Sequence, residues 1–291
     1  MSKLPPMQVT PEPSLPLTHG FLLIEPATMS YEPILQTLAM HPCTPRALTH
    51  REELMPRLVD LTSLEPDQQE WVSDIWRGEA TAHRPPVICA WLDSEGDVDE
   101  LAGHIARYLV GPGEDGRPVF WRYYDPRVLS LALAVLDPTQ RTAVLGPVTD
   151  WQFAWAGHHW RVSGPGTLAD DMDGHVPAWP RPDQWPRINC SEIAASVVAR
   201  LSVMSVEEAV RLPAELDRIF SEVARRGWLR NADALIDYAW HCLRYGQALE
   251  QHPAVVEVWS ALVRGEVAWR DVKAQLTLDD FRAAGTTARV A

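Results

Sequence analysis

Residues 119–130 read VFWRYYDPRVLS, an apolar and aromatic run with one arginine inside it, followed by Asp-Pro-Arg and a second apolar run. Asp125 before Pro126 is typical of a helix start, because the aspartate can accept hydrogen bonds from the free N–H groups of the first turn and proline is tolerated there. The stretch therefore predicts a strand over residues 119–124 and a helix over residues 127–136. That helix is apolar on nearly all sides, so we expect it to be buried.

The same alternation of strand and helix patterns runs along the residues before it. Phe21–Ile24 is a short continuous apolar run of the kind that forms buried strands. Strands that alternate with helices predict an α/β lobe with a mainly parallel sheet and surrounding helices, over residues 20–162. The further strands are predicted over residues 54–61 and 86–92, and the helices over residues 31–40, 67–77 and 98–110.

The end of this lobe predicts a β-hairpin at the sheet edge. Residues 151–155 and 158–162 alternate as half-exposed strands do, and Ala156-Gly157 lies between them. Ligands of parallel sheets bind at the carboxyl ends of the strands. The joint between the strand and the helix of residues 119–136 lies at such an end, so its location suggests a ligand site as one interpretation.

Beyond the hairpin the pattern changes. Residues 163–187 carry five prolines, three glycines and four aspartates, and predict a linker. Residues 188–280 predict an all-α lobe. At the two ends of the chain, residues 1–19 are rich in proline and predict an extended arm, and residues 281–291 form a tail.

The all-α lobe carries clear helix signals. Ser205 and Glu208 have the spacing of a capping box. Pro213 is expected in the first turn of the next helix, where proline is tolerated. Asn231 is expected to cap a further helix, whose apolar residues follow helical spacing for three turns before Gly246.

The composition indicates a folded chain with a strongly acidic balance. It has 291 residues, of which 46% are hydrophobic, and a formal net charge of −13. A surface of that sign repels nucleic-acid phosphates and anionic membranes, so neither is expected as a partner. No apolar run is long enough to span a bilayer, and the N-terminus lacks the apolar stretch of a signal peptide. We therefore expect no membrane insertion and a cytoplasmic location.

Two features of the composition leave alternatives open. Acidic residues are concentrated between Glu65 and Glu100, and this segment either faces a basic partner or is a solvated helix face with an acidic loop. The chain also has 13 tryptophans, which serve either in core packing or in contacts with a partner.

The sequence lacks the common catalytic and cofactor motifs. No Gly-rich phosphate loop follows a predicted strand, and no G-x-S-x-G elbow is present. His158 and His159 are adjacent, and adjacent residues of a strand point to opposite faces, so they cannot easily share a metal ion. We therefore expect no catalytic residue, no cofactor and no metal.

Arg122, Asp125 and Arg127 have two interpretations. A cation in the first turn of a helix is unfavourable for the helix dipole, so Arg127 should be paired with Asp125 or with a carboxylate elsewhere. One interpretation is a structural hub of salt bridges that ties the strand to the helix. The other is a contact with an anion or a partner protein.

The series from Phe120 to Leu129, then Leu136, Gln140, Leu145-Gly-Pro-Val148 and Trp151, resembles the core motif of domain-of-unknown-function family 4123. The resemblance covers roughly residues 20–162, and the all-α lobe matches no family we can name. Trp121 departs from the pattern, where the family often has no such bulk. The motif residues, which the resemblance implies to be structural or partner-binding, are Arg122, Tyr124, Asp125, Pro126, Arg127, Gly146, Pro147 and Trp151.

Members of that family act as adaptors, or effector chaperones, of bacterial type VI secretion systems. The resemblance thus implies a non-catalytic protein that binds a cognate toxic effector and loads it onto the spike protein of the secretion apparatus. We expect the all-α lobe to bind the effector and the α/β lobe to bind the spike.

Two other functions stay open at this point. One is an immunity protein that neutralises a toxin. The other is an enzyme whose site lies near Arg122, Asp125, Arg127 and His158. An enzyme of that kind predicts a deep polar pocket at the strand ends with shifted pKa values.

Overall fold

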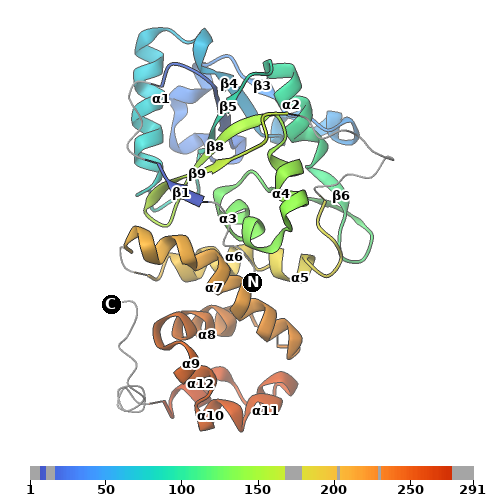
Figure 1. The fold of residues 1–291 in the computed structure, drawn as a ribbon, viewed down its shortest axis with the longest axis vertical. Helices are drawn as coiled ribbons and strands as arrows, with labels where there is room; N and C mark the ends of the chain where they lie inside the picture. Colours follow the sequence, from blue (N-terminus) through green and yellow to red (C-terminus); the bar gives the residue numbers. More distant parts are fainter. Residues whose placement is uncertain (1–6, 11–16, 168–178, 202–203, 229–230, 277–291) are drawn as a thin grey trace. The chain divides into compact units, whose positions relative to one another are not determined.

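The chain divides into two compact units, residues 1–185 and residues 186–291 (Figure 1). Within the part of the chain that the structure describes, no helix combines the length and the apolar composition that crossing a membrane requires. The predicted arm lies partly, and the predicted tail wholly, outside that part. The computed structural model describes residues 7–10, 17–167, 179–201, 204–228 and 231–276.

A seven-stranded antiparallel sheet forms the centre of the N-terminal unit. Its order is β1-β9-β8-β5-β2-β4-β3, and all neighbouring strands pair antiparallel, so the prediction of a mainly parallel sheet is wrong. The strands are β1 (Met7–Val9), β2 (Phe21–Ile24), β3 (His41–Pro42), β4 (Arg57–Asp60), β5 (Ile88–Ser94), β8 (Val148–Trp155) and β9 (His158–Ser163).

The strand order explains this error. β4 and β5 both run antiparallel to β2, so they run in the same direction as each other. The helix that joins them, α1 (Pro66–Glu79), is thus a crossover of the kind that the alternating pattern predicts. However, β2 lies between β4 and β5, and β8 pairs with β5 in the opposite direction. Alternation along the sequence indicates how strands are connected, and it does not indicate which strands are neighbours.

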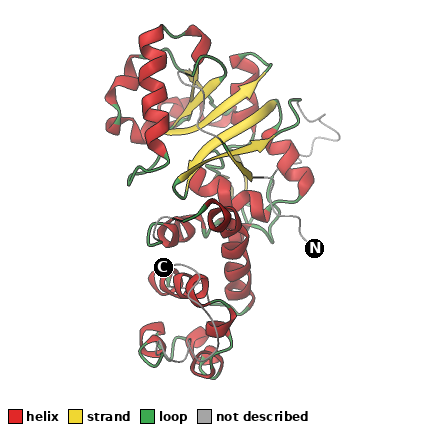
Figure 2. Ribbon diagram, turned by 60° about the vertical axis from the view of Figure 1, so that its left-hand side comes forward, coloured by secondary structure: helices red, strands yellow, loops and turns green. Residues whose placement is uncertain are grey.

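β2 is buried on both faces, as its continuous apolar sequence predicts. Leu22 and Ile24 belong to a core cluster that also contains Val72 and Trp76 of α1. Because side chains alternate along a strand, Leu23 points to the opposite face. In Figure 2, helices cover both faces of the sheet. The N-terminal unit therefore has a core on each side of its sheet.

Most of the predicted helices of this unit are present, and α3 is buried nearly all round. The helix expected over residues 31–40 is instead replaced by short 3-10 helices, because Pro33 cannot donate a helical hydrogen bond and starts a new turn. The remaining helices are η1 (Pro26–Tyr31), η2 (Pro33–Thr37), η3 (Arg46–Leu54), η4 (Leu61–Ser63), α2 (Val98–Arg107), α3 (Pro126–Val135) and α4 (Pro138–Leu145).

The predicted hairpin joins β8 to β9. Ala156 and Gly157 both have positive φ, 51° and 82°, as a two-residue hairpin turn requires. β9 is not at the edge, because β1 pairs along its other side.

Residues 179–185, which we call the strap, pack against the N-terminal unit. Gln184 is fully buried, and its side-chain amide exchanges two hydrogen bonds with that of Gln140, at 2.9 and 2.8 Å. The Trp179 indole donates to the Pro112 carbonyl at 2.6 Å. A Cβ on Gly111 would lie 2.7 Å from the Trp179 ring, so only glycine fits there. The strap therefore belongs to the N-terminal core.

The C-terminal unit is helical, as predicted. The Ser205–Glu208 capping box and the Asn231 cap are both present. Pro213 does not start a helix, however. It lies inside the continuous helix α7, which the buried stripe on both sides of the proline holds together. The helices are α5 (Trp185–Ile188), α6 (Ser191–Val198), α7 (Val206–Arg225), α8 (Ala232–Tyr245), α9 (Gln247–Glu250), α10 (Pro253–Val256), α11 (Trp259–Arg264) and α12 (Trp269–Lys273).

Candidate functional site

The residues before α3 form a buried turn. The predicted strand ends early, because β7 covers only Pro118–Phe120 and pairs with β6 (Val110–Pro112) in a separate two-stranded sheet. The Asp125 amide then donates to the Arg122 carbonyl at 3.0 Å. A strand would hold these two residues about 10 Å apart. The turn instead brings their side chains together.

Asp125 caps α3 as predicted. Its Oδ1 accepts a hydrogen bond from the Arg127 amide at 2.9 Å, and Pro126 occupies the first helical position. The Arg127 side chain folds back onto the same carboxylate, with Nε 2.9 Å from Oδ1 and Nη2 2.5 Å from Oδ2. The Asp125 side chain is buried, whereas that of Arg127 is about one-third exposed (36%). The cation that is unfavourable for the dipole of α3 is thus neutralised by the cap itself.

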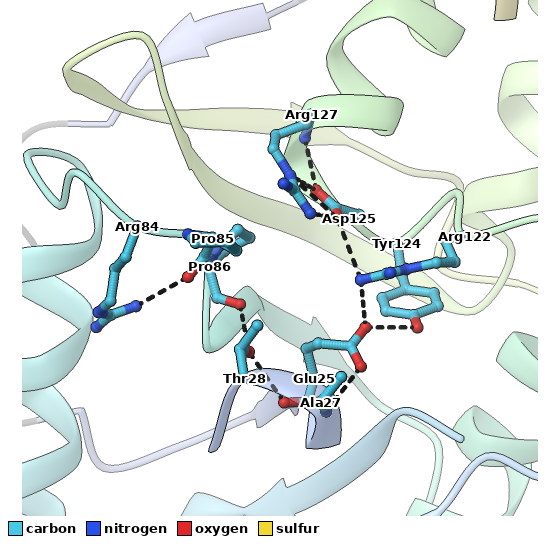
Figure 3. A network of polar contacts seen from close by, with 10 residues as sticks. All are labelled: Glu25, Ala27, Thr28, Arg84, Pro85, Pro86, Arg122, Tyr124, Asp125 and Arg127. Atoms are coloured by element: carbon cyan, nitrogen blue, oxygen red, sulfur yellow. Dashed lines mark hydrogen bonds and ion pairs between the residues drawn. The ribbon is translucent and has the colours of Figure 1, made fainter. Parts of the chain in front are cut away.

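Glu25 is the second buried carboxylate of this site, and it is not among the residues predicted for it. It follows β2 directly, and its Oε1 caps η1 by accepting from the Ala27 amide at 3.1 Å. Its Oε2 accepts from Arg122 Nη2 at 2.7 Å and from the Tyr124 hydroxyl at 2.9 Å (Figure 3). The available signal was an acid directly before Pro26, the same pattern as Asp125-Pro126.

Arg122 joins the two carboxylates. Its Nη2 lies 2.7 Å from Glu25 and 3.5 Å from Asp125. Burial lowers the pKa of Arg122, but Glu25, Tyr124 and Asp125 outweigh this effect and the pKa is raised, so the guanidinium stays charged. Burial, followed by the nearby Glu25, raises the pKa of Tyr124, so its hydroxyl keeps its proton and donates. With Arg127, the site holds two cations and two anions in mutual contact. We call Glu25, Arg122, Tyr124, Asp125 and Arg127 the charged joint.

A second buried carboxylate network lies beside the charged joint. Glu79, at the end of α1, accepts from the Val87 and Ile88 amides at 3.1 and 3.0 Å and from Arg84 at 3.1 Å. Burial raises the pKa of Glu79, against the opposing effects of these donors. The segment before β5 also receives the Thr28 hydroxyl, which donates to the Pro86 carbonyl at 2.7 Å (Figure 3). The two networks together tie η1, the start of β5 and α3.

The remaining motif residues also lie in the interior. Gly146 ends α4 with φ 50°, and a Cβ there would collide with the ring of His104. Burial lowers the pKa of His104 to about 4, so the ring is neutral, and its Nε2 lies 3.0 Å from the Val144 carbonyl. Pro147 accepts from the Ser94 hydroxyl at 2.9 Å. Trp151 is fully buried, with its ring 6.0 Å from that of Tyr123.

The two adjacent histidines contact different aromatic rings. His159 lies 4.7 Å from the Trp76 ring, and burial lowers its pKa. His158 lies 5.8 Å from the Trp160 ring. Within the described residues, no three His, Cys, Asp or Glu side chains gather as a metal site requires.

A family model matches the centre of the N-terminal unit. Residues 31–143 match the family described as Domain of unknown function (DUF4123), and we call them the DUF4123 segment. The DUF4123 segment contains Arg122, Tyr124, Asp125, Pro126 and Arg127. No curated protein and no solved structure matches this chain.

The DUF4123 segment does not contain the whole charged joint. Glu25 precedes the segment, and the Gly146-Pro147 pair and Trp151 follow it. The structure nevertheless brings these residues into one unit, because Glu25 pairs with Arg122 and Trp151 packs on Tyr123. The sequence resemblance was thus expected over a wider range, residues 20–162, than the match covers.

Several helices in the DUF4123 segment and beside it begin with the same dipeptide, an acidic residue followed by proline. In each case the acid is the residue before the first helical position and the proline fills that position. Asp137 adds a capping box with Gln140, whose amide also binds the strap. Among the described residues, the five pairs are Glu25-Pro26, Glu32-Pro33, Glu65-Pro66, Asp125-Pro126 and Asp137-Pro138.

Proposed function

We propose that this protein is a non-catalytic adaptor that binds a cognate type VI secretion effector in the cytoplasm and loads it onto the spike protein. The DUF4123 match supports this proposal through the family resemblance of the motif. The observation that carries the proposal is the mutual pairing of the motif charges. Asp125 and Glu25 are buried and bonded to Arg122 and Arg127, so the motif serves the fold of the unit that presents a binding surface.

The surface of the DUF4123 segment fits contact with another protein. Most of the large apolar side chains that the described residues expose lie in this segment. Trp71 is 43% exposed on α1, and Asp67 and Asp74 lie one turn away on the same helix face. Asp74 also pairs with Arg77 at 2.7 Å, but both side chains are exposed, so that pair is weak. An exposed tryptophan beside carboxylates suits a partner that offers an apolar and basic patch. In the proposed function that partner is the spike.

Co-expression with a candidate effector and a candidate spike, encoded by neighbouring genes, tests the proposal. We expect the full chain to raise the soluble yield of the effector and to retain both partners in a pull-down. Trp71→Ala should weaken spike retention about tenfold without a change in melting temperature, because the side chain is exposed. Val206→Ala, an equally exposed apolar side chain in the C-terminal unit, is the matched control and should leave spike retention unchanged.

Two outcomes would favour one of the alternative functions, an immunity protein or an enzyme, over the adaptor. An immunity protein would rescue cells from the toxin even when secretion is disabled, whereas an adaptor would not. An enzyme would lose turnover of its substrate in Arg122→Lys while the fold and partner binding persist. If the effector is neither solubilised nor retained by the full chain, the adaptor proposal is wrong.

A further inference from the structure

A groove of about 480 Å³ lies within the C-terminal unit, between the start of α8, the loop before α12 and α12 itself. The volume falls in the range of small-molecule and peptide-side-chain pockets. Its walls are mainly apolar, and they include the rings of Trp228 and Trp269 and the side chains of Leu262 and Val267. None of the chemistry described above uses this groove.

The aromatic wall of the groove is held rigidly. Gly227, with φ 78°, ends α7 and lets the Trp228 amide bond back to the Val223 carbonyl at 3.0 Å. The Trp228 ring then lies 6.2 Å from that of Trp269. The Tyr238 ring contacts both, at 5.4 Å from Trp228 and 5.1 Å from Trp269. The Trp269 indole donates to Asp237 at 2.7 Å. A wall fixed in this way loses little conformational entropy when a ligand binds.

Cations and carboxylates both line the groove, and most of the cations are already paired. Its lining carries three cations, Arg264, Arg270 and Lys273, and two carboxylates, Asp233 and Asp237. Arg264 is already paired with Glu266, at 2.7 and 2.9 Å. Asp237 already has two partners, because it accepts from the Trp269 indole and Lys273 Nζ lies 3.0 Å from it.

Arg270 is the cation at the groove that is most open to a partner. Its nearest carboxylate contact is Asp271 at 3.6 Å, and both side chains are strongly exposed, so that pair contributes little. A ligand carboxylate can therefore displace Asp271 at low cost. A ligand carboxylate beside an apolar side chain would match both the rim and the walls.

We propose that this groove binds a peptide segment of a partner protein that carries large apolar side chains flanked by acidic residues. The inference rests on the proposed function only in that an effector is the expected source of the segment. The groove, the ring cluster and Arg270 all lie within the C-terminal unit. The test needs no effector, so the peptide site and the adaptor role can fail separately.

Selection of short random peptides displayed on phage, against the immobilised full chain, tests the inference. We expect the recovered sequences to combine Leu, Phe or Trp with Asp or Glu. Ala268→Trp places a ring over the groove at an exposed position with extended backbone (φ −88°, ψ 144°), and should lower the affinity of a recovered peptide about tenfold.

Arg270→Glu reverses the charge at the rim and should lower that affinity roughly threefold. The fold should tolerate it, because an acid in the first turn of α12 suits the helix dipole. Arg211→Glu, an exposed arginine on α7 outside the groove, is the matched control and should leave the affinity unchanged. If the melting temperatures of all three variants stay unchanged, the losses of peptide affinity arise from the groove and not from unfolding.

Three results would overturn the inference. One is recovery of basic peptides, or of no peptides. Another is equal binding of the recovered peptides to Ala268→Trp and to the native chain. The third is self-association of the full chain that Ala268→Trp abolishes, because the occupant would then be a second copy.

Discussion

Asp125 accepts hydrogen bonds from the first turn of α3 and from the Arg127 side chain. The loss of either donor therefore leaves the same buried carboxylate with fewer hydrogen bonds. The helix-capping role of Asp125 was predictable, because capping depends on residues close in sequence. The pairing of Arg122 with Glu25 was not, because these residues are far apart in the chain and only the packing of β2 beside the turn brings them together. A short-range pattern cannot report a partner of that kind.

Arg127→Ala is expected to lower stability before it affects any partner. The change leaves Asp125 buried with the Arg127 amide and a long contact to Arg122, which should lower the free energy of unfolding by about 2 kcal/mol. Urea unfolding measures this. Arg117→Ala, which removes an exposed pair with Asp115, is the control and should change stability by less than about 0.5 kcal/mol. If Arg127→Ala is as stable as the control but loses spike or effector binding, the joint is an interface.

His104 should make the fold sensitive to acid. Its pKa is lowered from 6.5 to about 4 by burial, so the unfolded chain binds a proton in this range that the folded chain does not. The contribution of His104 is complete above about pH 6.5 and is lost as the pH falls toward 4, in total about 3 kcal/mol. Unfolding free energies measured across this range should fall more steeply for the native chain than for His104→Gln. Parallel curves would mean that His104 titrates alike in both states.

Among the elements of the N-terminal unit, the helix starts are encoded locally and the sheet is not. α1, α3 and α4 begin at an acid-proline pair, and the residue before a proline is restricted to extended backbone, so each start was readable from neighbouring residues. The direction of β2 between β4 and β5 depends on contacts across the whole unit. α1 and α3 were accordingly predicted close to their observed positions, whereas α4 was not predicted and the predicted strand pairing was wrong.

The end of α4 depends on glycine for two separate reasons. Gly146 has positive φ and also lies against the His104 ring, so a methyl group there is strained and collides. Gly116 also has positive φ, but open space surrounds its Cβ direction. We expect Gly146→Ala to lower the free energy of unfolding by about 3 kcal/mol, and Gly116→Ala by about 1 kcal/mol. Thermal unfolding of the two variants measures the difference, and equal losses would show that the contact with His104 has no energetic weight.

At the scale of the whole molecule, the strap decides where the N-terminal unit ends. Gln184 is buried against Gln140 and the Val135 carbonyl, and the Trp185 ring lies 5.9 Å from that of Trp121. A fragment that stops after the hairpin leaves the Gln140 amide and the Trp121 ring without these partners. Buried polar groups that lose their partners are costly.

We therefore expect a fragment of residues 1–185 to unfold cooperatively and a fragment of residues 1–162 to be strongly destabilised. Circular dichroism and urea unfolding of the two fragments check this. In the full chain, Gln184→Ala should reproduce part of the loss, about 2 kcal/mol, whereas Gln36→Ala at an exposed position should not. Equal stability of the two fragments would contradict the assignment of the strap to the core.

The two outer strands of the sheet have a consequence for the proposed adaptor function. β1 has three residues, and β3 has two, one of which is Pro42. Short edges and proline limit the backbone hydrogen bonds that a foreign strand can form. The sheet is thus a poor template for amyloid-like extension, and in the proposed adaptor function this holds for strands of the effector as well. In the proposed function, selection of partners would then depend on side chains, which discriminate between sequences, and not on the backbone, which is common to all of them.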